Sequence, residues 1–173
     1  MYSEISIIIT ILSSLSANYN YNTETLNRKE VHCLAQNIYH ESRGETNYGK
    51  LAVANVTKNR VKSDNYPNTY CNVVWEKKKS AKTGKMVPMF SWTLDGFSDD
   101  ILLENKQNVE SWKKSVVISS LVILDEFKDI TCGSTHYYAH EKVNPYWANS
   151  DNLKKSCVPR GKIGNHTFMK ANQ

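Results

Sequence analysis

The sequence lacks the short motifs by which several large classes of protein are identified. It has no C-x-x-C pair, no zinc-finger spacing, no P-loop and no GxGxxG fingerprint. It also has no internal repeat, no low-complexity block and no linker-like stretch that would divide its 173 residues. These absences give no support to a zinc-finger, nucleotide-binding or repeat protein, and the length suits a single domain.

A long apolar run is missing as well. The most apolar stretch, residues 5–15, is shorter than the roughly 17–25 residues that span a bilayer. Ser16, Ala17 and a polar run follow it, as in a signal peptide, but Glu4 precedes it without any Lys or Arg. Residues 1–24 are therefore either a signal- or anchor-like segment or a packed N-terminal element, and residues 25–173 form the functional domain. We expect a chain that begins near Tyr21 to fold and to retain its chemistry.

Acidic residues are too few to balance the basic ones, which leaves a formal net charge of +5. Such a charge favours polyanionic partners, such as nucleic acid or an anionic cell wall. Much of the excess lies in one run, which we interpret as a solvated basic loop over residues 77–88 and which contains Lys77, Lys78, Lys79, Lys82 and Lys85. These lysines are not interleaved with aromatic side chains on one face, so no nucleic-acid partner is expected.

Apolar periodicity predicts a mainly helical α+β domain with a small β region in its C-terminal third. A first helix is expected to begin at a capping box of Asn27 and Glu30 and to end near Glu41, with Gly44 free to take a left-handed conformation. The other expected elements are a helix from Thr46 to about Lys62, a short helix over residues 69–77, a long helix over residues 108–127, and strands over residues 135–139 and 165–170.

The four cysteines match no metal-binding spacing. Cys33 falls within the first predicted helix and is interpreted as a small buried apolar residue. Cys132 and Cys157 bracket an irregular segment with proline and glycine, where a disulfide would help most in an exported protein. Connectivity cannot be read from sequence, so this pairing stays open.

A carboxyl side chain occupies the last position of the apolar stripe of the first predicted helix. Glu41 follows the spacing of Leu34 and Ile38, shortly before Gly44. The C-terminal end of a helix and burial among apolar side chains both disfavour a negative charge, so both raise the pKa of a carboxyl there. A raised pKa suits a general acid that works near neutral pH. On periodicity alone, an exposed Glu41, or one paired with Arg43 or Arg60, is the simpler interpretation.

The residues around Glu41, and the order of several later stretches, favour the catalytic interpretation. The stretch IYHESRGE at residues 38–45 is followed by Gly49, by AVANV at 52–56 and by NRV at 59–61. The stretches YPNT, FSW, THYYA, NPYWA and IGNHTF follow in order, at residues 66–69, 90–92, 135–139, 144–148 and 163–168. Together they resemble the cell-wall hydrolase family typified by bacterial spore-cortex-lytic enzymes, over about residues 28–170. Ser42 replaces the family's usual Ala, the lysine-rich insertion is a departure, and no peptidoglycan-binding repeat module is present.

This resemblance implies a lysozyme-like helical fold and cleavage of peptidoglycan glycan strands next to N-acetylmuramic acid. Glu41 corresponds to the family's catalytic acid. As in lytic transglycosylases, it would act first as acid and then as base, while the 6-hydroxyl of muramic acid attacks the anomeric carbon and leaves a 1,6-anhydro end. A hydrolytic muramidase with the same site and a non-catalytic glycan-binding or virion structural protein are the alternatives.

The resemblance also implies partners and location. Peptidoglycan is the expected partner, no metal or cofactor is expected, and we expect a monomer. The site of action is the cell wall, the periplasm or the cell exterior. A small domain without wall-binding repeats suits a bacteriophage lysis or virion enzyme somewhat better than a spore enzyme.

Several polar and aromatic residues are candidates for a sugar groove, because aromatic faces pack on pyranose rings and polar atoms bind their hydroxyls. In the predicted strand 135–139, one face carries two of these candidates and Tyr137 lies on the other. Substrate binding is assigned to Ser91, His136, Tyr138 and His166, whereas Trp75 and Trp112 are assigned to the core.

Three further possibilities involve residues near these candidates. Glu45 is either a second carboxyl of the substrate site or a structural residue in the first turn of the next helix, where acids are favoured. A nucleophilic pair of Cys132 and His136 lacks an orienting signature. A zinc site is weaker still, because His136, His140 and His166 lack a recognised spacing.

Overall fold

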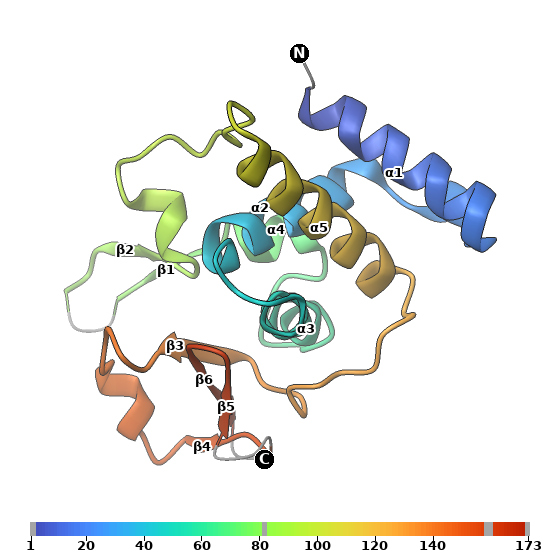
Figure 1. Cartoon of the computed structure of the whole chain (residues 1–173). Coiled ribbons are helices and arrows are strands. Elements are labelled where there is room, and N and C mark those ends of the chain that lie inside the picture. Colours follow the sequence, from blue (N-terminus) through green and yellow to red (C-terminus); the bar gives the residue numbers. More distant parts are fainter. Residues whose placement is uncertain (1–2, 81–82, 158–160, 172–173) are drawn as a thin grey trace.

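Figure 1 shows the computed structural model of the chain, in which residues 3–80, 83–157 and 161–171 are described. The helices are α1 (Glu4–Tyr19), α2 (Arg28–Ser42), α3 (Asn47–Val61), α4 (Tyr70–Val74) and α5 (Lys106–Ile123), with the short 3-10 helices η1 (Thr23–Thr25), η2 (Ser91–Leu94) and η3 (Tyr146–Asn149). The strands are β1 (Lys77–Lys79), β2 (Met86–Pro88), β3 (His136–Ala139), β4 (Leu153–Lys155), β5 (Lys162–Ile163) and β6 (His166–Ala171). The predicted mainly helical α+β class is confirmed.

Helix α2 is central and contacts α3, α4 and α5 (Figure 1). Its predicted apolar stripe is fully buried and consists of Val31, Leu34, Ala35 and Ile38. Asn27 caps the helix by accepting a hydrogen bond from the backbone N–H of Lys29. Glu30 does not complete the predicted capping box, because its carboxylate accepts the N–H groups of Tyr70 and Cys71 at the start of α4. A carboxylate stabilises the unpaired N–H groups of any helix start within its reach, and here that start belongs to another helix.

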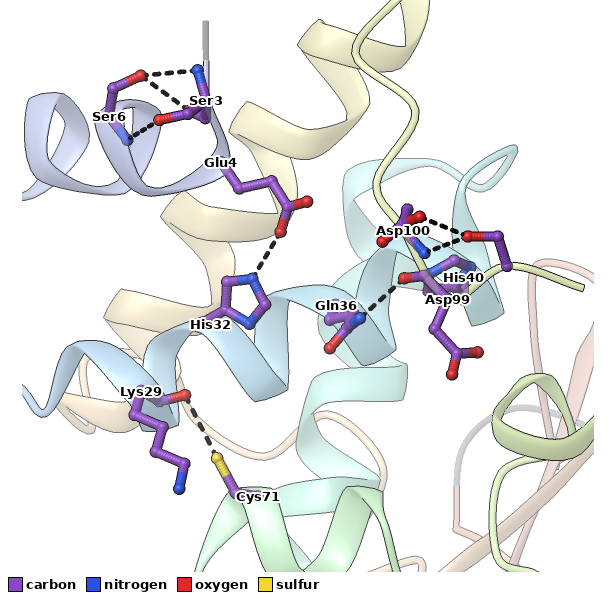
Figure 2. A network of polar contacts seen from close by, with 11 residues as sticks. Ser3, Glu4, Ser6, Lys29, His32, Gln36, His40, Cys71, Asp99 and Asp100 are labelled. Atoms are coloured by element: carbon purple, nitrogen blue, oxygen red, sulfur yellow. Dashed lines mark hydrogen bonds and ion pairs between the residues drawn. The ribbon is translucent and has the colours of Figure 1, made fainter.

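Helix α1 packs against α5, on the side of the molecule away from the C-terminal sheet (Figure 1). Its buried face joins the core cluster around Trp112 and consists of Ile7, Ile8, Leu12 and Leu15. Figure 2 shows that Glu4 of α1 also reaches α2, where its Oε2 lies 2.6 Å from Nε2 of His32. No helix within the described ranges combines the length and the apolar character needed to cross a membrane.

Two disulfides link parts of the fold that are distant in sequence. Cys33 of α2 is bonded to Cys71 of α4, and Cys132 is bonded to Cys157. The interpretation of Cys33 as a merely apolar core residue is therefore wrong. Both Cys33 and Cys71 are buried, so burial alone does not distinguish a free thiol from a bridged one. The bond at Cys132 also excludes a thiolate nucleophile at that position.

Strand β6 is the centre of the C-terminal sheet. It pairs antiparallel with β3 along one edge, with Tyr137 opposite Phe168, and with β4 and β5 along the other. Ile163 and Phe168 are buried against Ala52 and Val56 of α3. The sheet thus lies against α3, which separates it from α1 and much of α5 (Figure 1).

Two local predictions need correction. The basic stretch is not a plain loop, because β1 and β2 form an antiparallel hairpin in which Lys78 is paired with Val87. Exposed lysines on a two-stranded hairpin leave no apolar periodicity that would reveal a strand. Trp75 is 38% exposed rather than part of the core, and its ring meets the ring of Trp92 edge-on at 5.1 Å.

Candidate active site

Glu41 lies in the last turn of α2 and lines a cavity of about 340 Å³. Much of its lining comes from the end of β2 and the segment after it, residues 88–91. The segment that follows β3 contributes Val143, Pro145 and Trp147. Strands β3 and β6 and helix α3 supply Tyr137, Tyr138, Ala139, His166 and Arg60. Within the described part of the chain, Glu41 is the only carboxylate that lines this cavity.

The stretch from Phe90 to Trp92 is fixed on the helices by its two aromatic residues. The Trp92 ring stacks on His40 with centroids 4.4 Å apart, and its Nε1 donates to Oδ1 of Asn37 at 2.9 Å. The ring of Phe90 lies 4.7 Å from the guanidinium carbon of Arg60. These contacts hold the polar residue between them, Ser91, exposed at the cavity.

Two side chains from other elements set the electrostatics of Glu41. The hydroxyl of Tyr137 donates a hydrogen bond of 2.9 Å to Oε2 of Glu41. Arg60 of α3 is buried and attracts the Glu41 carboxylate electrostatically. Nε of Arg60 donates to the carbonyl oxygen of Thr135 at 2.8 Å, whereas its Nη1 is buried without a hydrogen-bond partner. The carboxylate therefore lies beside one fixed hydrogen-bond donor and one buried cation.

The pKa of Glu41 is raised above its ordinary value because burial withdraws water from the charged form. The Tyr137 hydrogen bond and the Arg60 charge act in the opposite direction without cancelling this effect. Burial also raises the pKa of Tyr137 well above 10, so the hydroxyl keeps its proton near neutral pH and remains a donor. The site thus retains a protonated carboxyl to a higher pH than an exposed glutamate does.

The end of α2 differs from the prediction, because a buried lysine binds its last carbonyl oxygens. Gly44 is not among the glycines with positive φ, and Arg43 keeps right-handed helical angles. Nζ of Lys50, on α3, donates to the carbonyl oxygens of Ser42 and Arg43 at 2.5 and 3.1 Å. A cation at this end of a helix is favourable, since the unpaired carbonyls carry partial negative charge. A side chain from the next helix therefore ends α2 in place of the predicted left-handed glycine.

Glu45 lies outside the Glu41 cavity and outside the first turn of α3. It precedes the N-cap residue, Thr46, so its predicted place inside the helix is wrong. Its Oε1 accepts a hydrogen bond of 2.8 Å from Nδ2 of Asn165. Gly164, at φ +56°, is needed for this contact, because a Cβ there would overlap Oε2 of Glu45. Glu45 thus joins the start of α3 to the turn between β5 and β6.

The structure brings three of the four predicted groove residues to the cavity. Ser91, Tyr138 and His166 line it, whereas His136 lines a neighbouring cavity. His136 and Tyr138 share a face of β3, but they lie at different points along the strand and so reach different cavities. The histidine cluster considered for zinc does not form in the described residues, where no group of three or more potential ligands gathers.

The sequence interpretation does not assign Tyr137 or Arg60 to the site. Tyr137 is expected on the face opposite to the groove candidates, and Arg60 is considered only as an ion-pair partner of Glu41. Both residues belong to stretches that carry the family resemblance, THYYA and NRV. Their membership of those stretches is the signal by which they could have been found.

Comparison with known proteins places the chain in a family. Residues 44–169, most of the chain, match the family model described as cell wall hydrolase, and Glu41 lies just ahead of that range. The chain belongs to the cell wall hydrolase family. A stretch of 49 residues is 43% identical to the spore cortex-lytic enzyme of Bacillus cereus. That stretch covers 28% of this chain and only 19% of the Bacillus cereus enzyme.

Two solved structures resemble this cell wall hydrolase in fold. The catalytic domain of the germination-specific lytic transglycosylase SleB from Bacillus anthracis has a TM-score of 0.58 at 27% identity, covering 84% of this chain and 98% of that domain. The catalytic domain of SleB from Bacillus cereus has a TM-score of 0.51 at 25% identity, covering 83% of this chain and 91% of that domain. The lysozyme-like α+β fold implied by the sequence resemblance is confirmed.

Proposed function

We propose that this cell wall hydrolase cleaves peptidoglycan glycan strands next to N-acetylmuramic acid, with Glu41 as its catalytic acid and base. The observation that carries the proposal is a single carboxyl with a raised pKa in a cavity of aromatic and polar side chains. A raised pKa keeps a carboxyl protonated for general acid catalysis, and aromatic rings with hydrogen-bonding groups suit sugars. The relationship to a lytic transglycosylase domain supports the same activity.

The proposed reaction is an internal transfer rather than a hydrolysis. Protonated Glu41 gives its proton to the glycosidic oxygen while the bond from that oxygen to the anomeric carbon of muramic acid breaks. The resulting carboxylate accepts the proton of the muramic acid 6-hydroxyl, whose oxygen then bonds to the anomeric carbon. The product is a 1,6-anhydro end, and Glu41 finishes protonated. Ordinary glycosidases use two carboxyls, whereas this cavity offers one among the described residues.

Tyr137 and Arg60 have complementary parts in this scheme. By donating to Oε2, Tyr137 fixes the carboxyl group and leaves Oε1 for the substrate. The buried charge of Arg60 stabilises the carboxylate that forms when the proton leaves. Neither group transfers a proton itself, since the pKa of Tyr137 is far above neutral and a guanidinium keeps its proton.

Mass spectrometry of digested peptidoglycan tests the proposal most directly. The expected products are glycan fragments with 1,6-anhydro-muramic ends. Reducing muramic ends would instead show a hydrolytic muramidase with the same site. Uncut strands that the protein nevertheless binds would show a non-catalytic glycan-binding protein, and cut peptides on intact strands would overturn the glycosidase assignment.

Tyr137→Phe is expected to move the alkaline limb of the kcat/KM profile to higher pH. The Tyr137 hydrogen bond favours the charged form of Glu41, so its loss raises the pKa of Glu41 further. An acid catalyst is active while protonated and loses activity as the pH rises through its pKa. The measurement is the pH dependence of kcat/KM on soluble glycan strands.

Tyr138→Phe is the matched control for this shift. Tyr138 lines the same cavity but makes no hydrogen bond to Glu41 among the described contacts, so its loss should leave the limb in place whatever it does to the rate. A limb that stays in place or moves to lower pH in Tyr137→Phe would contradict the assignment of that limb to Glu41.

The disulfides support a site of action outside the cytoplasm. Disulfide bonds persist in oxidising compartments and are rare where thioredoxin and glutathione keep thiols reduced. All four cysteines of this chain are bridged. This redox chemistry suits a protein that meets its peptidoglycan substrate at the wall.

A further inference from the structure

A second cavity lies next to the one that contains Glu41. It has a volume of about 350 Å³, close to the 340 Å³ of the first. Trp147 of η3 lines both cavities. Its ring lies 5.7 Å from that of Tyr138, which lines the first cavity, and 5.4 Å from that of His136, which lines the second. The two cavities are therefore neighbours on either side of one aromatic side chain.

The lining of the second cavity is uncharged, and it combines hydrogen-bonding groups with aromatic rings and with the apolar side chains of Leu153 and Ala171. Hydroxyl, amide and imidazole groups come from several loops and strands and belong to Ser63, Asn65, Tyr66, His136, Ser150 and Asn152. No carboxylate, lysine or arginine is among the described residues that line it. Neutral hydrogen-bonding groups beside aromatic rings suit a neutral ligand that carries many hydroxyl or amide groups, as a sugar does.

His136 is held in a form that fits such a ligand. Its Nδ1 lies 3.0 Å from Oγ1 of Thr135. Burial, together with the charges of Arg60 and Lys78, lowers the pKa of His136 to about 4, so the ring is neutral at physiological pH. A neutral imidazole offers one donor and one acceptor nitrogen. With Nδ1 engaged by Thr135, Nε2 is the nitrogen left for a ligand.

We propose that the second cavity is a further sugar subsite, which binds the same glycan strand beyond the residues held at Glu41. This inference rests on the proposed function, because the occupant is identified by continuity with the cleavage cavity through Trp147. The Trp147 ring is a shared apolar platform between the two cavities, and His136 and Asn152 supply hydrogen bonds on the far side. A long glycan strand then contacts both cavities, whereas a short glycan fragment at Glu41 does not reach the second.

The test measures binding of strands of two lengths to the full chain carrying Glu41→Gln, which prevents cleavage. The probes are peptide-free tetrasaccharides and octasaccharides isolated from peptidoglycan, and binding is followed by calorimetry. His136→Ala and Asn152→Ala, each added separately, should weaken octasaccharide binding about fivefold, the size expected for one hydrogen bond. The ratio of octasaccharide to tetrasaccharide affinity should fall by the same factor.

Asn149→Ala is the control, since Asn149 is exposed on the same short helix as Trp147 but lines neither cavity. Asn152 is exposed, so its replacement reports on binding even where His136→Ala disturbs the strand. An unchanged affinity ratio in Asn152→Ala and in folded His136→Ala would overturn the subsite and leave the cleavage cavity standing. Failure of both oligosaccharides to bind the Glu41→Gln protein would overturn the proposed function as well.

Discussion

Replacing Glu41 by Gln is expected to abolish the lysis of purified peptidoglycan while leaving the fold intact. The change removes the transferable proton at almost constant shape, and the amide can still accept the hydrogen bond from Tyr137. General acid catalysis contributes about 10²–10⁴-fold, so the loss is large enough to be measured in a simple assay of released soluble fragments. Retention of most of the activity would show that Glu41 is not the acid.

Glu45→Gln is the matched control, because it makes the same chemical change four positions along the sequence. The introduced amide would keep an oxygen acceptor for Asn165, so the link between α3 and the turn before β6 should survive. Activity should fall much less than in Glu41→Gln. An equal loss would identify Glu45 as a second catalytic carboxyl and favour a two-carboxyl mechanism.

The Glu41→Gln substitution also has an expected effect on stability. The pKa of Glu41 is higher in the folded chain than in the unfolded one, so the folded state binds more protons between those two values. The wild-type protein therefore loses stability as the pH rises through that window, and a variant with an amide at this position does not. Glu41→Gln should consequently melt at a higher temperature than the wild type above the window and at nearly the same temperature below it.

The helices could be predicted from sequence because their signals are local. The caps at Asn27 and Thr46 are observed, and the stripe from Val31 to Ile38 is buried as its spacing predicts. The long helix is observed as α5, from Lys106 to Ile123, slightly displaced from the predicted residues 108–127. Each of these features depends on residues within a few turns of one another.

The errors on α2 arise where the deciding partner belongs to another helix. Glu30 caps α4 rather than its own helix, and the partner of Cys33 is Cys71. The end of α2 is completed by Lys50 from the next helix rather than by Gly44. Local propensity gives Glu30, Cys33 and Gly44 plausible roles on their own helix, and only the packing of α2 against α3 and α4 shows which contacts form.

The candidate site also has one part that the sequence predicts and one part that it does not. Glu41 can be selected from one stretch of sequence, since its place on the helix and the family resemblance agree. Its position in the cavity depends on the Tyr137 hydroxyl, which lies 96 residues away in sequence, and on the charge of Arg60. Periodicity assigns neither neighbour to the site. It shows which residues share a face of a helix or strand, but not which residues of other elements that face contacts.

Removing either disulfide is expected to lower the free energy of unfolding strongly while leaving the reaction products unchanged. The bridge from Cys33 to Cys71 closes a loop of 38 residues and that from Cys132 to Cys157 a loop of 25. Loop-closure entropy gives roughly 4 kcal/mol for the longer loop and roughly 3.5 kcal/mol for the shorter. Both Cys33 and Cys71 are also buried, so replacing that pair by alanine removes core contacts in addition.

The measurement compares urea midpoints of the two paired alanine variants with that of the wild type. The Cys33→Ala/Cys71→Ala protein should have the lowest midpoint and the Cys132→Ala/Cys157→Ala protein an intermediate one. Each variant should still release the same glycan fragments under native conditions, because no cysteine lines the Glu41 cavity among the described residues. Reduction of the wild type should lower its midpoint below that of either variant, since it opens both loops at once. A midpoint that does not respond to reduction would show that the bridges contribute nothing to stability, and a change in the products would mean that a cysteine takes part in the chemistry.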